Sequence, residues 1–228
     1  CVDISNIFGT SAVGATVRAA RGTRDLLTYL VASMVYRDAL AALFAFGGIY
    51  AAGVLGWGLF ELGIFGIVAA GAGALGAWAG GRADSAFGPR PVIVVSIWAL
   101  VAVSTVALLT TRESVLLLPV AAGSRLPDLV FTLAGAVLGA GAGSLQAASR
   151  TMLVLQAEGH VESGQAFGLY ALAGKVTAFI GPALIAAVTA ATGSQRLGVS
   201  PVIALFLLGL ALLSFVKTTQ EQARSEAA

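Results

Sequence analysis

Three ionisable residues stand inside long apolar runs of this sequence, where a charge is costly. Arg37 and Asp38 are adjacent in MVYRDALAAL, and Lys175 lies in FGLYALAGKVTAFIGP. Within a lipid bilayer such residues face the interior of a helix bundle or a water-filled cavity, and they mark substrate or ion pathways. They are therefore the first candidates for a functional site.

The three side chains are expected at similar depths. Arg37 and Asp38 lie about eleven residues, or about 16 Å, from the start of their run, and Lys175 lies about 15 Å from the same face. Neighbouring helix positions point about 100° apart, so Arg37 and Asp38 cannot share a partner on their own helix. We expect Asp38 and Lys175 to approach one another across a polar cavity, which leaves Arg37 to meet an anionic group. A purely structural ion pair is the alternative.

Four further polar residues are candidates for the same pathway. Tyr36, Tyr50 and Tyr170 flank the charges, and Gln146 lies near the end of another apolar run. Their hydroxyl and amide groups could line a route, although tyrosines more often lie at membrane interfaces or fill packing.

Gly181 and Pro182 follow Lys175 within one apolar run. Proline cannot continue the hydrogen-bonding pattern of a helix, so this pair predicts a kink or a broken helix. Transporters use broken helices at their binding sites, but a passive kink is an equally good interpretation.

The composition is that of a membrane protein. Of 228 residues, 58% are hydrophobic and 11% are charged, whereas soluble domains are about a quarter charged. The net charge of +2 and the scattered basic residues argue against a nucleic-acid-binding surface. One cysteine, Cys1, and one histidine, His160, offer neither a disulfide nor a metal site. No catalytic or cofactor-binding motif is present, so we expect neither an enzyme nor a cofactor.

Six apolar runs are long enough to cross the roughly 30 Å hydrocarbon core as helices. Strand-like alternation is absent from them, and helices satisfy their backbone groups within lipid, so the sequence predicts an all-α membrane protein. The predicted spans are Leu26–Ala52, Leu62–Gly80, Pro91–Leu109, Leu129–Ala148, Ala166–Ala190 and Ser200–Val216.

The basic residues favour an orientation with both ends in the cytoplasm. In that orientation the cytoplasmic segments hold eight Lys and Arg residues and the outer segments hold three. Segments 1–25 and 217–228 are expected to be a cytoplasmic linker and a cytoplasmic tail on either side of a six-helix unit, 26–216. Because the first residue is Cys1 rather than methionine, we expect the chain to be part of a longer protein.

Small residues dominate two of the predicted spans. Gly66–Gly81 and Ala134–Ser149 contain several pairs of small residues four positions apart, a spacing that lets helix backbones approach closely. We therefore expect these two segments to be tightly packed, although a general bias toward Gly and Ala would give the same pattern.

The stretch GGRADSAFGPRP is predicted to be a cytoplasmic loop between the second and third spans. An acid there would meet the positive end of the following helix, and a basic residue could pair with a neighbouring helix or a lipid phosphate. Contacts of this kind can bias two conformational states by about 1 to 3 kcal/mol, although the arginines could instead serve only to set the topology. The candidate residues are Gly81, Arg82, Asp84, Gly88 and Arg90.

Four stretches, in order, resemble a known family of transporters. GGRADSAFGPRP is similar to the signature loop of the major facilitator superfamily. VYRDALAALFAFGGIYAAGVLG, GSLQAASRTM and FGLYALAGKVTAFIGP resemble the vacuole-effluxer, autophagy-related permease group of that superfamily. The resemblance implies the C-terminal half of a twelve-helix secondary transporter, six helices in two inverted three-helix repeats, whose N-terminal half is missing from this chain.

The same resemblance implies an efflux-type permease that moves a small solute, amino acids among its eukaryotic relatives, by alternating access. Its partners would be that solute, the lipid bilayer and the missing N-terminal half of the transporter. It would be located in a cell membrane. The sequence leaves open whether Asp38 carries a coupling proton. A six-helix scaffold or assembly subunit, in which the buried charges are structural, is the alternative class of protein.

Overall fold

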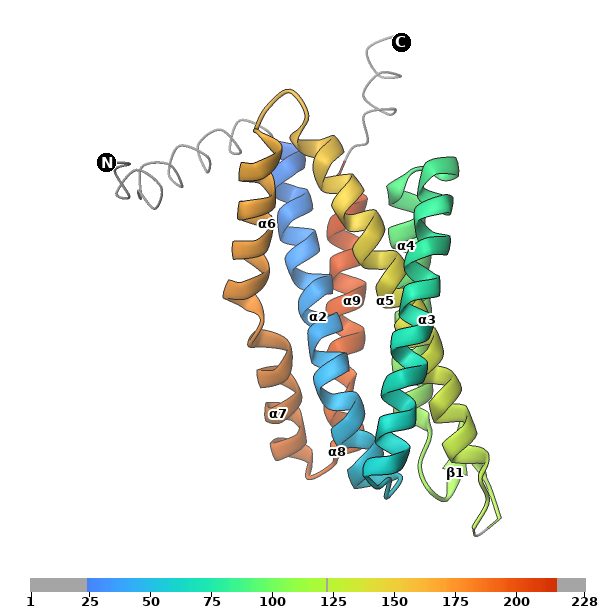
Figure 1. Cartoon of the computed structure of the whole chain (residues 1–228). Coiled ribbons are helices and arrows are strands. Elements are labelled where there is room, and N and C mark those ends of the chain that lie inside the picture. Colours follow the sequence, from blue (N-terminus) through green and yellow to red (C-terminus); the bar gives the residue numbers. More distant parts are fainter. Residues whose placement is uncertain (1–23, 122, 217–228) are drawn as a thin grey trace, which may run out of the picture.

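The computed structural model describes residues 24–121 and 123–216, which form a bundle of helices (Figure 1). Six segments are long and apolar enough to cross a membrane, and each overlaps one of the predicted spans. The prediction of an all-α, six-helix membrane fold is thereby confirmed. The helices are α2 (Arg24–Val54), α3 (Leu59–Phe87), α4 (Pro89–Leu109), α5 (Leu126–Ala157), α6 (Ser163–Thr177), α7 (Ile180–Thr192), α8 (Gln195–Gly198) and α9 (Ser200–Ser214).

The spans run alternately up and down the bundle. Helix α2 begins and α9 ends at the same end of the bundle, at the top of Figure 1, where α3 also joins α4 and α5 joins α6. We call this the terminal end, and the other the distal end. The predicted linker and tail, 1–25 and 217–228, lie almost wholly outside the described residues.

A turn joins the second and third spans within the predicted stretch, but the predicted length of the loop is wrong. Helix α3 continues to Phe87 rather than ending at Gly80, so all of RADSAF is helical. Polar residues ended the apolar run, but they do not stop a helix. The turn is confined to Gly88, whose φ of 85° suits glycine, and Pro89 opens α4 with a φ suited to a helix start. Helix α5 likewise extends beyond its predicted end, to Ala157.

A short hairpin at the distal end was not predicted. Strands β1 (Ser114–Val115) and β2 (Leu118–Pro119) pair antiparallel between α4 and α5. Leu116 and Leu117 form the turn with positive φ angles of 50° and 69°. Strands of two residues are too short to produce a readable alternation in a sequence.

Helices α3 and α5 pack with their backbones in close contact. A Cβ atom added to Gly76 would overlap the backbone of Ala140, and one added to Gly139 would overlap the backbone of Ala69. The hydroxyl of Ser144 donates a hydrogen bond of 2.7 Å to the Gly76 carbonyl. The expectation that the two small-residue segments pack tightly is therefore confirmed, and each packs against the other.

Helix α2 is the most buried of the spans. Half of the most apolar stretch of α2 is buried, compared with 11% of the corresponding stretch in α3 and 11% in the span made of α6 and α7. In Figure 1, α2 lies between the α6–α7 segment and the remaining helices. Residues in the middle of α2 are therefore held inside the described bundle.

A pair of Gly→Ala variants in α3 tests the backbone contact. Gly76→Ala should lower the free energy of unfolding by about 1 to 3 kcal/mol, because the new methyl group overlaps the Ala140 backbone. The matched control is Gly71→Ala, whose Cβ would meet no atom within 4 Å. Thermal unfolding of the full-length protein in detergent measures both variants, and equal midpoints would contradict the predicted contact.

Candidate functional site

The fifth span is divided into two helices near the middle of the bundle. Helix α6 ends at Thr177 and α7 begins at Ile180. Pro182 cannot donate a hydrogen bond to the carbonyl four residues earlier, at Ala178, and its ring would clash with that carbonyl. The sequence prediction of a kink or break at Gly181 and Pro182 is confirmed, in the form of a break.

Asp38 of α2 binds the backbone of α7 just after this break. The Gly181 N–H donates a hydrogen bond of 3.1 Å to Asp38 Oδ2. Gly181 lies in the first turn of α7, where N–H groups have no partner within the helix and where the helix dipole favours a negative charge. The Asp38 side chain therefore acts as an N-terminal cap supplied by another helix.

The close approach of α7 to α2 depends on Gly181. A Cβ atom at this position would lie 2.7 Å from the Ala42 Cβ and 2.8 Å from the Asp38 carbonyl oxygen. Asp38 is only 4% exposed, and its second carboxyl oxygen, Oδ1, is buried without a hydrogen-bond partner among the described residues. The carboxyl group thus keeps one unused acceptor inside the bundle.

Arg37 points to the other half of the broken span. Its Nη1 donates a hydrogen bond of 2.9 Å to the Tyr170 carbonyl oxygen of α6. Its Cζ lies 3.8 Å from the centre of the Tyr170 ring, within the range of a cation–π contact. No ion pair forms to Arg37 within residues 24–121 and 123–216. Neutral groups therefore hold this half-buried cation.

The expected contact between Asp38 and Lys175 is not formed. Lys175 is exposed, whereas Asp38 is buried and binds Gly181. The reason is the angular spacing of α6: Gly174, like Tyr170 one turn earlier, faces α2, since a Cβ at Gly174 would lie 2.8 Å from Arg37 Nη2. The next residue points about 100° away from that contact. Lys175 therefore projects from the surface of the described bundle.

Tyr36 lies in a buried hydroxyl cluster. Its hydroxyl is 2.8 Å from Ser149 Oγ of α5 and 3.4 Å from the hydroxyl of Tyr29. Tyr29 in turn donates a hydrogen bond to the Ser149 carbonyl. Tyr29 and Ser149 were missed from the sequence, although Tyr29 lies seven residues before Tyr36 and so on the same face of α2. The cluster joins α2 to α5 rather than lining an open route.

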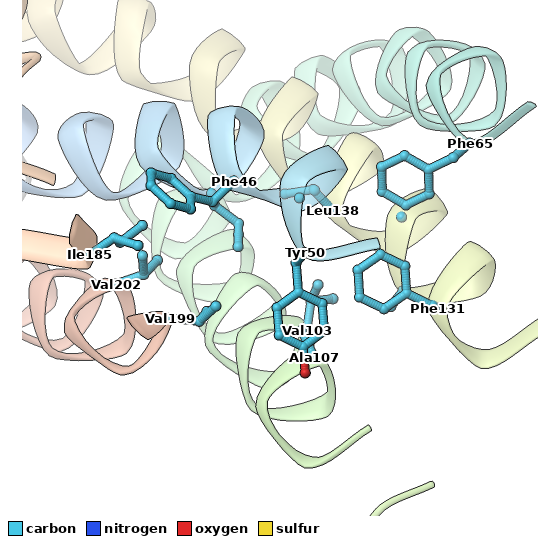
Figure 2. Close-up of a pocket in the computed structure, with 14 residues that line it drawn as sticks. Phe46, Tyr50, Phe65, Val103, Ala107, Phe131, Leu138, Ile185, Val199 and Val202 are labelled. Atoms are coloured by element: carbon cyan, nitrogen blue, oxygen red, sulfur yellow. The ribbon is translucent and has the colours of Figure 1, made fainter. Parts of the chain in front are cut away.

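Tyr50 lies apart from the charged residues, toward the distal end. It stacks on Phe131 with ring centres 5.7 Å apart and donates a hydrogen bond of 2.9 Å to the Thr110 carbonyl. Figure 2 shows the two rings side by side in an apolar pocket that Phe65 and Leu138 also line. The contacts of Tyr50 are therefore those of a packed core residue.

Gln146 also lies apart from Arg37 and Asp38. It is exposed and lines a groove between α2, α3 and α5, together with Arg150 and the small residues of both packed helices. The structure therefore brings three of the candidates, Arg37, Asp38 and Tyr170, together with Gly181 at the break. We call Arg37, Asp38, Tyr170 and Gly181 the break cluster, with Lys175 on the adjacent surface of α6.

The residues of the predicted loop make contacts at the terminal end. Arg90 Nη2 donates a hydrogen bond of 3.3 Å to the carbonyl of Ser214, the last residue of α9. A cation at a helix C-terminus is favourable because of the helix dipole. Arg82 remains on its own helix, with its Cζ 4.3 Å from the centre of the Trp78 ring. Of these two arginines, Arg90 is thus the one with a contact to another span.

Six spans of this length and hydropathy define a multi-pass membrane protein, and a broken span beside ionisable residues is an arrangement that transporters use. The family model described as "Vacuole effluxer Atg22 like" matches residues 3–228. The chain therefore belongs to the Atg22-like vacuole effluxers, membrane permeases of the major facilitator type, and corresponds to the C-terminal half of such a permease. No curated protein shows significant similarity to the chain.

Two substitutions of Asp38 distinguish its role as a helix cap from the effect of its charge. Asp38→Ala removes the acceptor for Gly181 and should destabilise the full-length protein by about 1 kcal/mol, the usual effect of losing a helix cap. Asp38→Asn keeps an oxygen that accepts the same hydrogen bond, so its unfolding midpoint should stay closer to that of the wild type. Thermal unfolding in detergent compares them, and an unchanged midpoint for Asp38→Ala would contradict the capping role.

Proposed function

We propose that the protein is half of an efflux-type secondary transporter that moves a small solute, with amino acids as the first class to test, by alternating access. The observation that supports this most is the broken fifth span, whose two halves are held by Arg37 and Asp38 of α2. Broken helices in transporters present free backbone groups near the membrane midplane, where substrates and ions bind. The break cluster is the proposed binding site.

The exposure of Lys175 supports a polar route beside α6. Lys175 lies about 18 Å along α6 from its start, and Arg37 lies about 20 Å along α2 from its start at the same end. A lysine at this depth is costly to place in lipid, by about 2.5 to 3.5 kcal/mol or more. The α6 surface that carries Lys175 is therefore proposed to face a polar route and the N-terminal half of the transporter.

The terminal end supplies a candidate for conformational switching. We propose that Arg90 contacts the end of α9 in one access state and releases it in the other, with Gly88 as the turning point. A contact of this kind could shift the balance of two states by about 1 to 3 kcal/mol. Gly81, Arg82 and Asp84 lie on the α3 side of this turn and would move with it.

We propose that both ends of this segment are cytoplasmic and that the protein resides in the cell's plasma membrane. The excess of Lys and Arg in the segments at the terminal end supports the orientation. Fluorescent fusions to each end of the full-length protein locate it, and a vacuolar location would fit the family description instead of the plasma membrane.

Counterflow of labelled amino acids in proteoliposomes tests the transport proposal. We expect Asp38→Asn and Lys175→Met in the full-length protein to lower the rate at least about tenfold, equivalent to about 1.4 kcal/mol of lost stabilisation. Arg125→Met is the matched control, because it removes an exposed positive charge at the distal end.

Two results would count against the proposal. Wild-type rates in both variants would favour a structural role for the buried charges, as in a membrane scaffold. Absence of counterflow in the wild-type protein for every labelled amino acid would remove amino acids as the substrate class.

A further inference from the structure

We propose that Arg37 binds a carboxylate group of the transported solute, which takes the place of the Tyr170 carbonyl as the partner of the guanidinium. The inference rests on the proposed transport function and names the chemical class of the substrate. It depends on three features of the break cluster: its charge, the hydrogen-bonding state of Arg37, and the groups packed against the guanidinium.

The charge around the break is positive. Among the described residues, the middle of the spans carries two cations, Arg37 and Lys175, and one acid, Asp38. The acid is already engaged by Gly181 and forms no ion pair with either cation. A positive charge deep in a membrane protein is costly unless a negative group compensates it. An anionic solute would supply that compensation while bound.

The guanidinium of Arg37 has unused hydrogen-bonding capacity. An arginine has five N–H donors, and within the described residues one bond is made by this side chain, from Nη1 to the Tyr170 carbonyl. That carbonyl is a neutral acceptor in the backbone of α6. A carboxylate can accept two parallel, charge-assisted hydrogen bonds from one guanidinium and is therefore the stronger partner.

The surroundings of Arg37 orient its guanidinium group. The Tyr170 ring covers one face of the group at 3.8 Å. Gly174 lies against it from α6, and a Cβ there would come within 2.8 Å of Nη2 and 3.0 Å of Nη1. Stacking on a ring leaves the edge of the guanidinium, where the N–H groups point, for a planar acceptor. Ring and glycine together form the socket for the cation.

The depth of the site selects among sources of a carboxylate or phosphate. Arg37 lies about 20 Å along α2 from its start, well inside a hydrocarbon core of about 30 Å. Lipid headgroups lie outside that core, so the anion is a small solute that enters the bundle. Inorganic phosphate is the competing anion, and the experiment includes it.

Thermal unfolding of the full-length protein in detergent provides the direct test. Sodium acetate is the probe, sodium phosphate is the competing anion, and sodium chloride at equal ionic strength and neutral acetamide are the references. In the wild-type protein, saturating acetate should raise the unfolding midpoint by about 3 °C, because a ligand that binds only the folded state stabilises it. Acetamide and chloride should leave it unchanged.

Three variants assign the effect to the proposed socket. Arg37→Lys keeps the charge but loses the planar fork, and Gly174→Ala places a methyl group against the guanidinium, so both should lose most of the acetate shift. Gly168→Ala is the matched control in the same helix: its Cβ would meet no atom within 4 Å, and it should respond like the wild type. An acetate shift that persists in Arg37→Lys and Gly174→Ala, or no acetate shift in the wild type, would overturn the inference. A shift with phosphate alone would overturn the choice of carboxylate.

Counterflow in proteoliposomes separates this inference from the proposed function. If labelled amino acids are transported and both Arg37→Lys and Gly174→Ala match the wild type, the carboxylate site is wrong while the transport function stands. If no labelled amino acid is transported but acetate binds in a way that depends on Arg37, the site stands and amino acids are wrong as its solute.

Discussion

The hydrogen bond between the Gly181 N–H and the Asp38 carboxylate is the constraint on which the centre of this bundle depends. Inside a membrane no water is at hand for unpaired backbone groups, so a break in a spanning helix must be satisfied by other parts of the protein. Pro182 makes the break, Asp38 satisfies the exposed N–H, and Gly181 brings α7 close enough for the bond to form. A negative charge at a helix N-terminus adds to its stability.

Two adjacent residues of α2 therefore control both halves of one broken span. Arg37 holds α6 through Tyr170, and Asp38 holds α7 through Gly181. Their side chains differ in direction by about 100°, which is why each reaches a different half-helix. A solute that replaces the Tyr170 carbonyl as the partner of Arg37 would weaken the contact between α2 and α6, while Asp38 would still cap α7. In the proposed mechanism, solute binding at Arg37 would therefore let α6 move against α2.

The sequence predicted the features that depend on local chemistry. Apolar length predicted six spans, Pro182 predicted the break, and small-residue spacing predicted the close packing of α3 and α5. It did not predict which side chains meet across helices: the expected contact between Asp38 and Lys175 is absent. That outcome depends on the rotation of α6 about its axis, which places Gly174 rather than Lys175 against α2. The true length of α3 was also missed, because polar residues end an apolar run without ending a helix.

The polar route proposed along α6 beside the break is tested most directly by the accessibility of a cysteine to water. In full-length protein with Cys1 replaced by serine, Lys175→Cys should react with a membrane-impermeant, charged thiol reagent. Trp98→Cys, at an exposed apolar position of α4 that we propose faces lipid, should react only with a membrane-permeant reagent. Equal protection of both cysteines from the charged reagent would contradict the polar route and place Lys175 against lipid or protein.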